Sequence, residues 1–129
     1  MGVSPASQRV NWTKYSSSEP AIASHWSGLL CVFWTEITLA GGEIYYKTGT
    51  IGGPNWSASK KVSGNSSSPA VGVDFSGNLH LAWSYYFSPG NNEVYYRRST
   101  DGGASWAPSQ RLSWTSGSSD YPEIGRAHV

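Results

Sequence analysis

The chain has 129 residues, including 15 Gly, 7 Trp, 8 Tyr and 3 Phe, and only 13% of its residues are charged. This composition describes a turn-rich β protein and argues against a mainly helical or a disordered chain. The net charge of +1, spread over scattered Lys and Arg residues, disfavours nucleic acid and anionic membranes as partners. No run of 18 apolar residues predicts a membrane span, and the polar residues 1–8 do not resemble a signal peptide.

The predicted elements follow one another as short strands joined by Gly, Asn, Ser and Pro residues. Residues 1–19 are predicted to form the outer strand of a preceding unit and a connecting loop. Two full units follow at 20–68 and 69–121, and residues 122–124 begin a third. The strands are expected at 20–24, 29–35, 43–48 and 60–63 in the first unit, and at 69–73, 78–84, 93–98 and 110–113 in the second. In the second strand, alternation with a period of two places Leu30, Val32 and Trp34 on one face.

An internal repeat underlies this division of the chain. The segment 43–47 returns at 93–97 with an offset of 50, and 20–34 aligns with 69–83 at an offset of 49. Segment 7–13 returns at 109–115, two periods later. Four antiparallel strands recurring about every 50 residues are typical of β-propeller blades. A β-sandwich would also have short strands, but it would not explain the fixed spacing. We therefore predict an all-β fold, a β-propeller segment of two four-stranded antiparallel blades with partial strands at both ends.

One turn carries a family motif. Residues 99–106 have the form Ser-x-Asp-x-Gly-x-x-Trp, with Ser99, Asp101, Gly103 and Trp106 at the defining positions. Here the chain resembles the Asp-box repeats of sialidase-like and sugar-binding propellers. The Asp carboxylate can accept hydrogen bonds from turn N–H groups, the Gly permits a positive φ, and the Trp covers the base of the hairpin. We expect these residues to be structural. The first copy, 49–56, is degenerate because Ile51 replaces the Asp.

The resemblance also implies where a ligand would bind. In the family, Asp boxes lie on the propeller face opposite the ligand site. The ligand face is then formed by segments 11–19, 35–42, 64–68, 85–92 and 114–121. Aromatic rings beside polar groups suit sugars, because the C–H face of a pyranose stacks on a ring. The candidate ligand-binding residues are Trp12, Tyr15, Glu36, Tyr85, Tyr86, Trp114 and Tyr121. An alternative for Trp12 and Trp114 is packing between blades. The remaining blade aromatics are assigned to packing: Trp34, Trp83, Tyr45, Tyr46, Tyr95 and Tyr96.

Catalytic residues are not predicted in this segment. The sialidases that the chain resembles use an arginine cluster, a Tyr–Glu pair and an Asp acid from several blades, which two blades cannot supply. Glu43 and Glu93 recur at the start of the third strand, and this recurrence favours a role in building each blade over paired-carboxylate catalysis. The three histidines lack metal-ligand spacing, so no metal or cofactor is expected. Cys31, the only cysteine, is expected to be a small buried residue.

The last residues of the chain depart from the repeat. When back-translated, 124–129 match a common short-read sequencing adapter, so 125–129 are predicted to be a non-native tail on a truncated, metagenomic-type fragment. The leading hypothesis is a non-catalytic segment of a secreted or surface bacterial protein whose complete ring binds glycans. One alternative is part of a sialidase-like glycoside hydrolase with its catalytic residues in other blades, and another is an architectural propeller for protein contacts. Self-association is also expected, with three chains giving six blades as the simplest closure.

Overall fold

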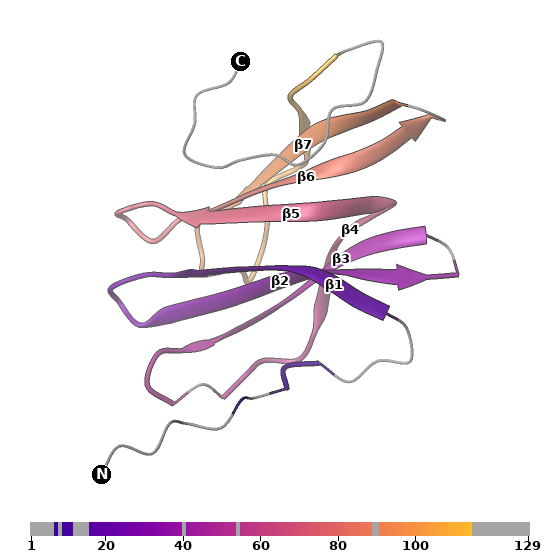
Figure 1. Cartoon of the computed structure of the whole chain (residues 1–129). Helices are drawn as coiled ribbons and strands as arrows, with labels where there is room; N and C mark the ends of the chain where they lie inside the picture. The colour runs from indigo at the N-terminus through magenta and orange to yellow at the C-terminus, as the bar shows by residue number, and fades with distance from the viewer. Residues whose placement is uncertain are drawn as a thin grey trace.

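A computed structural model describes residues 7, 9–11, 16–39, 41–53, 55–88 and 91–114. Within these ranges the chain forms eight strands in two four-stranded sheets and no helix (Figure 1). The first sheet contains β1 (Ser16–Ser24), β2 (Leu29–Thr38), β3 (Gly41–Thr50) and β4 (Lys60–Gly64). The second contains β5 (Ser66–Val73), β6 (Leu79–Ser88), β7 (Asn91–Ser99) and β8 (Gln110–Arg111). The described residues include no helix long and apolar enough to cross a membrane.

Each sheet is an antiparallel meander in which every strand pairs with the next strand in the sequence. The two sheets keep the same register. Phe33 pairs with Tyr46 in the first sheet, and Ala82 pairs with Tyr96 at the equivalent position of the second. The predicted fold class, two four-stranded antiparallel blades of a β-propeller, is therefore confirmed for the described residues.

The boundaries of the strands differ from the predicted ones. β1 begins at Ser16, within the predicted loop, and β4 and β5 are separated by Asn65 alone. Main-chain pairing in a hairpin continues to the turn, whereas apolar alternation marks only the buried part of a strand. β8 has two residues where four were expected. Residues 9–11 are not in a strand, and the predicted third-unit start at 122–124 lies outside the described residues.

The two blades pack against each other through faces that are not equivalent in the repeat. The core contains Cys31 and Phe33 from β2 and Leu79, Leu81 and Trp83 from β6, all fully or almost fully buried. In the repeat, Leu79, Leu81 and Trp83 correspond to Leu30, Val32 and Trp34, not to Cys31 and Phe33. One face of the first sheet therefore packs against the non-equivalent face of the second sheet. β5 lies directly against the first sheet (Figure 1).

Hydrogen bonds join the two blades across this core. Tyr46 donates its hydroxyl to the Gly103 carbonyl at 2.6 Å, and Arg97 donates Nη1–H to the Val62 carbonyl at 2.9 Å. Both acceptors are main-chain carbonyls, so these bonds fix the position of one sheet backbone relative to the other.

A further connection is made at a bulge that both blades share. Glu19 and Ser68 occupy equivalent positions, with φ of 55° and 56°, and each precedes a proline. The register of the first strand shifts at the same place in both sheets. The Glu19 carboxylate accepts hydrogen bonds from the Ser68 N–H and hydroxyl, both at 3.0 Å. The side chain of one bulge therefore holds the backbone of the next.

Candidate functional site

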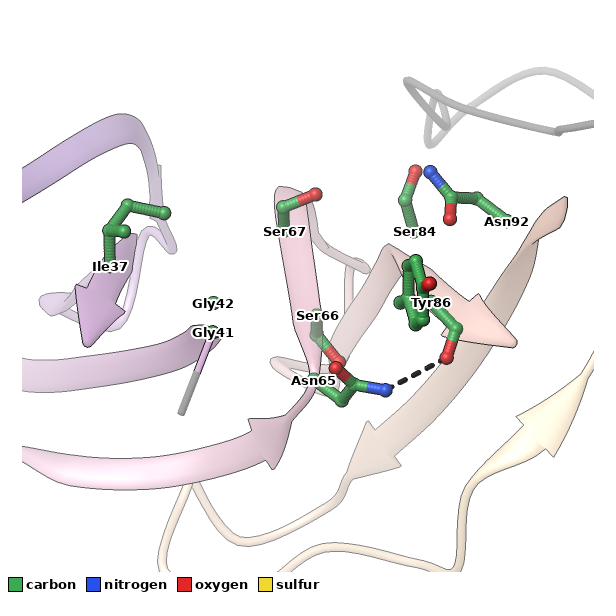
Figure 2. A pocket seen from close by; sticks show the side chains of 9 residues that line it. All are labelled: Ile37, Gly41, Gly42, Asn65, Ser66, Ser67, Ser84, Tyr86 and Asn92. Atoms are coloured by element: carbon green, nitrogen blue, oxygen red, sulfur yellow. Dashed lines mark hydrogen bonds between the residues drawn. The ribbon is translucent and has the colours of Figure 1, made fainter. Parts of the chain in front are cut away.

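A pocket of about 380 Å³ opens where the two hairpin ends and the connection between the blades meet. It brings together parts of the predicted segments 35–42, 64–68 and 85–92 (Figure 2). Its volume lies within the range of about 300–1,000 Å³ that is usual for small-molecule sites. The lining residues are Ile37, Gly41, Gly42, Asn65, Ser66, Ser67, Ser84, Tyr86 and Asn92.

The floor of the pocket is shaped by a close approach of the two blades. A Cβ atom on Gly42 would lie 2.5 Å from the carbonyl oxygen of Ser66, so this position admits only glycine without a backbone shift. Asn65 has a φ of 53°, a conformation that Asn tolerates better than most residues. Its Nδ2 donates to the Tyr86 carbonyl at 2.9 Å, and Tyr86 N–H donates back to the Asn65 carbonyl at 3.0 Å. The connection between the blades is therefore fixed to β6, as Figure 2 shows for the side-chain bond.

The chemistry of the lining is that of hydroxyl, amide and apolar groups. Ile37 and Tyr86 are about half exposed and supply apolar surface. Ser84 is 2% exposed, and its Oγ has no hydrogen-bond partner. A buried hydroxyl without a partner carries a desolvation cost that a bound polar group could offset. Ser66 differs, because its hydroxyl bonds to the Ser63 hydroxyl and the Gly64 carbonyl at 2.6 and 2.7 Å.

Of the seven sequence-predicted ligand residues, Tyr86 lines the pocket. Tyr85, its neighbour in β6, packs against the core and lies 4.8 Å from the Tyr95 ring, centroid to centroid. Trp114 is exposed, and the Arg111 guanidinium stacks over its ring at 5.3 Å. Trp12, Tyr15 and Tyr121 lie outside the described residues.

Glu36 lies away from the pocket, on the opposite side of the first sheet. Its Oε1 accepts hydrogen bonds from Trp34 Nε1 at 3.0 Å and Ser17 Oγ at 2.9 Å. Its Oε2 is buried without a partner. Ser17 and Trp34 also line a smaller hollow of about 240 Å³ together with Val10 and Asn11. Glu36 therefore borders a second concave surface, formed partly by the predicted segment 11–19.

Several lining residues were absent from the sequence prediction. Gly41, Gly42 and Asn65 could have been found from the sequence as turn residues, since Gly and Asn tolerate positive φ. Gly41 has a φ of 114°. Ser84 and Asn92 gave no local signal, because their position depends on how the second sheet packs.

The recurring glutamates each pair with a cation on the fourth strand. Lys61 Nζ lies 3.5 Å from Glu43 Oε2, and Arg111 Nη2 lies 3.5 Å from Glu93 Oε2. Tyr45 donates its hydroxyl to Glu43 Oε1 at 3.1 Å. Burial, followed by this bond and the charge of Glu43, raises the pKa of Tyr45. Both glutamates therefore connect the third strand to the fourth strand of their own sheet.

The Ser99–Trp106 turn, on the end of the sheets opposite the pocket, is closed by its own side chains. The Asp101 carboxylate accepts hydrogen bonds from the Ser105 hydroxyl, the Ser105 N–H at 2.9 Å and the Ser99 hydroxyl at 2.8 Å. These bonds, with that from the Ser105 hydroxyl foremost, lower the pKa of Asp101 to about 2. Trp106 reaches into the preceding blade and packs edge-on against Phe33 and Tyr46. The Trp therefore joins two blades rather than only covering its own hairpin.

The described part of the chain brings together no group of three His, Cys, Asp or Glu side chains that could hold a metal ion. Cys31 is buried, and its thiol donates a weak hydrogen bond to the Ala23 carbonyl at 3.5 Å. Burial raises the pKa of this thiol to about 11. Such a thiol is an inert packing group.

Comparison with known proteins agrees with this fold. No protein-family model and no curated protein matches the chain. Solved structures do match, among them one described as "Hadza microbial sialidase Hz136", with a TM-score of 0.58 and 19% sequence identity over 74% of this chain. The chain spans 25% of the length of that sialidase. The chain therefore has a sialidase-like β-propeller fold.

Proposed function

We propose that this chain is a non-catalytic segment of an Asp-box β-propeller and that the pocket between its blades binds carbohydrate. The observation that carries the proposal is the lining itself, in which the ring of Tyr86 and the side chain of Ile37 stand beside hydroxyl and amide groups. A neutral pyranose has an apolar C–H face and a rim of hydroxyls, so it matches both kinds of surface. The partnerless hydroxyl of Ser84 offers it a polar contact.

Titration with single sugars tests this proposal. We expect glucose, galactose or N-acetylglucosamine to shift the NMR signals of Asn65 and Tyr86 with millimolar affinity. Ser84→Ala should weaken binding without lowering stability, because the Ser84 hydroxyl has no partner to lose. Tyr86→Ala should weaken it further. Tyr85→Phe is the matched control, since Tyr85 packs away from the pocket. Unchanged affinity in both pocket variants would contradict the proposal.

A second candidate function is favoured by the fold comparison. The sialidase with the similar fold is about four times as long as the aligned part of this chain, since the chain spans 25% of it. We propose as the alternative that a longer parent protein is a glycoside hydrolase whose catalytic residues come from other blades. An arginine cluster and a Tyr–Glu pair in the parent gene, together with cleavage of a fluorogenic sialoside by its product, would favour this alternative over a pure binding role.

We propose that the parent is a secreted or cell-surface protein that contacts glycans, and that this chain self-associates to complete a ring, with a trimer as the simplest form. Sedimentation velocity should show a concentration-dependent trimer. A well-folded monomer at every concentration would contradict self-association. An architectural role would instead be supported by a protein partner and the absence of glycan binding.

A further inference from the structure

Two large aromatic rings stand exposed side by side at the end of the sheets opposite the pocket. Trp26, in the turn between β1 and β2, is 77% exposed, and Phe75, in the turn between β5 and β6, is 84% exposed. Their ring centroids lie 6.2 Å apart with a tilt of 42°. β2 has 10 residues, so these turns are about 30 Å from the hairpin ends that form the pocket. We call Trp26 and Phe75 the aromatic pair.

The repeat encodes the aromatic pair. Trp26-Ser27-Gly28 and Phe75-Ser76-Gly77 occupy equivalent positions at an offset of 49. Both glycines have positive φ, 103° and 89°, which the turn requires. Both serines are exposed. Each blade therefore presents an aromatic ring followed by a hydroxyl at the same place, which is a patterned surface rather than a single stray apolar residue.

Backbone hydrogen bonds hold both turns in place. In the first turn, His25 N–H donates to the Leu29 carbonyl and Gly28 N–H to the His25 carbonyl, both at 2.9 Å. In the second, Asp74 N–H donates to the Asn78 carbonyl at 3.0 Å and Gly77 N–H to the Asp74 carbonyl at 2.9 Å. A rigid turn presents its side chain at a low entropic cost of binding.

His25 sets the spacing between the two rings. It is buried, and its Nε2 lies 2.8 Å from the Phe75 carbonyl. A carbonyl can only accept, so Nε2 carries the proton and Nδ1 is the acceptor, which faces the Ser27 hydroxyl at 2.8 Å and the Ser27 N–H at 3.2 Å. The imidazole also lies 5.1 Å from the Trp26 ring, centroid to centroid. One side chain thus connects both turns and supports one of the rings.

We propose that the aromatic pair is a second carbohydrate-binding surface, which takes neighbouring pyranose units of a neutral oligosaccharide. Each ring offers an apolar plane for the C–H face of a sugar, and Ser27 and Ser76 offer hydroxyls beside it. Two aromatic side chains supply about 300–500 Å² at most, well below the roughly 800 Å² per partner of a stable protein interface. The size of the surface therefore fits a small ligand better than a protein. The aromatic pair can bind sugar whether or not the pocket does.

The test uses the whole chain with cellohexaose and chitohexaose as probes and follows the indole N–H signal of Trp26 by NMR. We expect a saturable shift of this signal, and a loss of affinity of about tenfold in Trp26→Ala and in Phe75→Ala. Both side chains are exposed, so neither change should affect folding. Leu39→Ala is the matched control, because Leu39 is an exposed apolar residue at the other end of the sheets. Tyr86→Ala should also leave this binding unchanged, which separates it from the pocket.

Two outcomes would overturn the proposal. One is the absence of any shift at Trp26 with either probe up to about 10 mM, where even weak binding is measurable. The other is undiminished binding of both probes in Trp26→Ala and in Phe75→Ala, which would place the bound sugar elsewhere on the chain.

Discussion

Removing one oxygen atom from Tyr46 tests the contact between the blades. Tyr46 is 4% exposed and donates its hydroxyl to the Gly103 carbonyl at 2.6 Å. Tyr46→Phe keeps the ring, which stacks on Phe33 at 5.3 Å and meets Trp106 at 5.6 Å. Only the hydrogen bond is lost, and the buried carbonyl is left without that donor. A typical hydrogen bond contributes about 1 kcal/mol, and an unsatisfied buried group costs about 1–3 kcal/mol. We therefore expect the free energy of unfolding to fall by about 1–3 kcal/mol.

The matched control is Tyr96→Phe, at the equivalent position of the second blade. Tyr96 bonds to His80 Nδ1 at 2.7 Å in a half-buried setting, where water can replace the lost partner. The free energy of unfolding of the Tyr96→Phe variant should therefore fall by less than about 1 kcal/mol. Urea titration followed by circular dichroism gives both values, with a lower midpoint and an unchanged slope for Tyr46→Phe. Equal losses in the two variants would refute the assignment of Tyr46 to the joint between the blades.

Three further changes test other parts of the structure. Asp101→Asn should lower stability at neutral pH, because hydrogen bonds from Ser105 hold the carboxyl pKa at about 2, below the unfolded value of about 3.9. This contribution to stability is fully present above about pH 4 and is lost as the pH falls towards 2. A difference in unfolding free energy between Asp101→Asn and the unsubstituted chain that stays constant in acid would count against it. Gly42→Ala would place Cβ 2.5 Å from a backbone oxygen and should cost about 1–3 kcal/mol, whereas Gly53→Ala, with open space around it, should change the melting temperature little. Cys31, whose pKa burial raises to about 11, should react with iodoacetamide only as the protein unfolds, and rapid labelling under native conditions would show that the thiol is accessible.

The repeat allowed the sheets and their strand order to be predicted from the sequence. A constant offset of 49 or 50 fixes which segments are equivalent, and short antiparallel strands joined by turns pair with their neighbours. The sequence did not show which face of each strand is buried. Leu30 and Leu79 are equivalent by sequence, yet Leu79 is fully buried and Leu30 is only partly buried. The reason is that the two sheets pack through faces that are not equivalent in the repeat. The alternation of apolar and polar residues within one strand does not indicate which face another sheet will cover.

The location of the pocket was predictable, but its lining was not. Three of the predicted ligand-side segments meet there. Within a strand, neighbouring side chains point to opposite faces, so a choice between Tyr85 and Tyr86, or between Glu36 and Ile37, needs the register of the sheet. Tyr86 and Ile37 face the pocket, while Glu36 bonds to Trp34 on the other side. Ser84 lines the pocket because of how the second sheet packs, which the sequence around it does not indicate.

The bonds between the blades have a consequence for cooperativity. They are spread along the whole interface, from the His25 bond to Phe75 at one end to the Glu19 bonds to Ser68 near the other. In repeat proteins, coupling between neighbouring units can exceed the stability of each unit alone. Neither sheet can open here without breaking contacts of the other, so both should melt in a single transition. Cutting the chain at Asn65, the single residue between the sheets, should yield two halves that fold only when they are mixed.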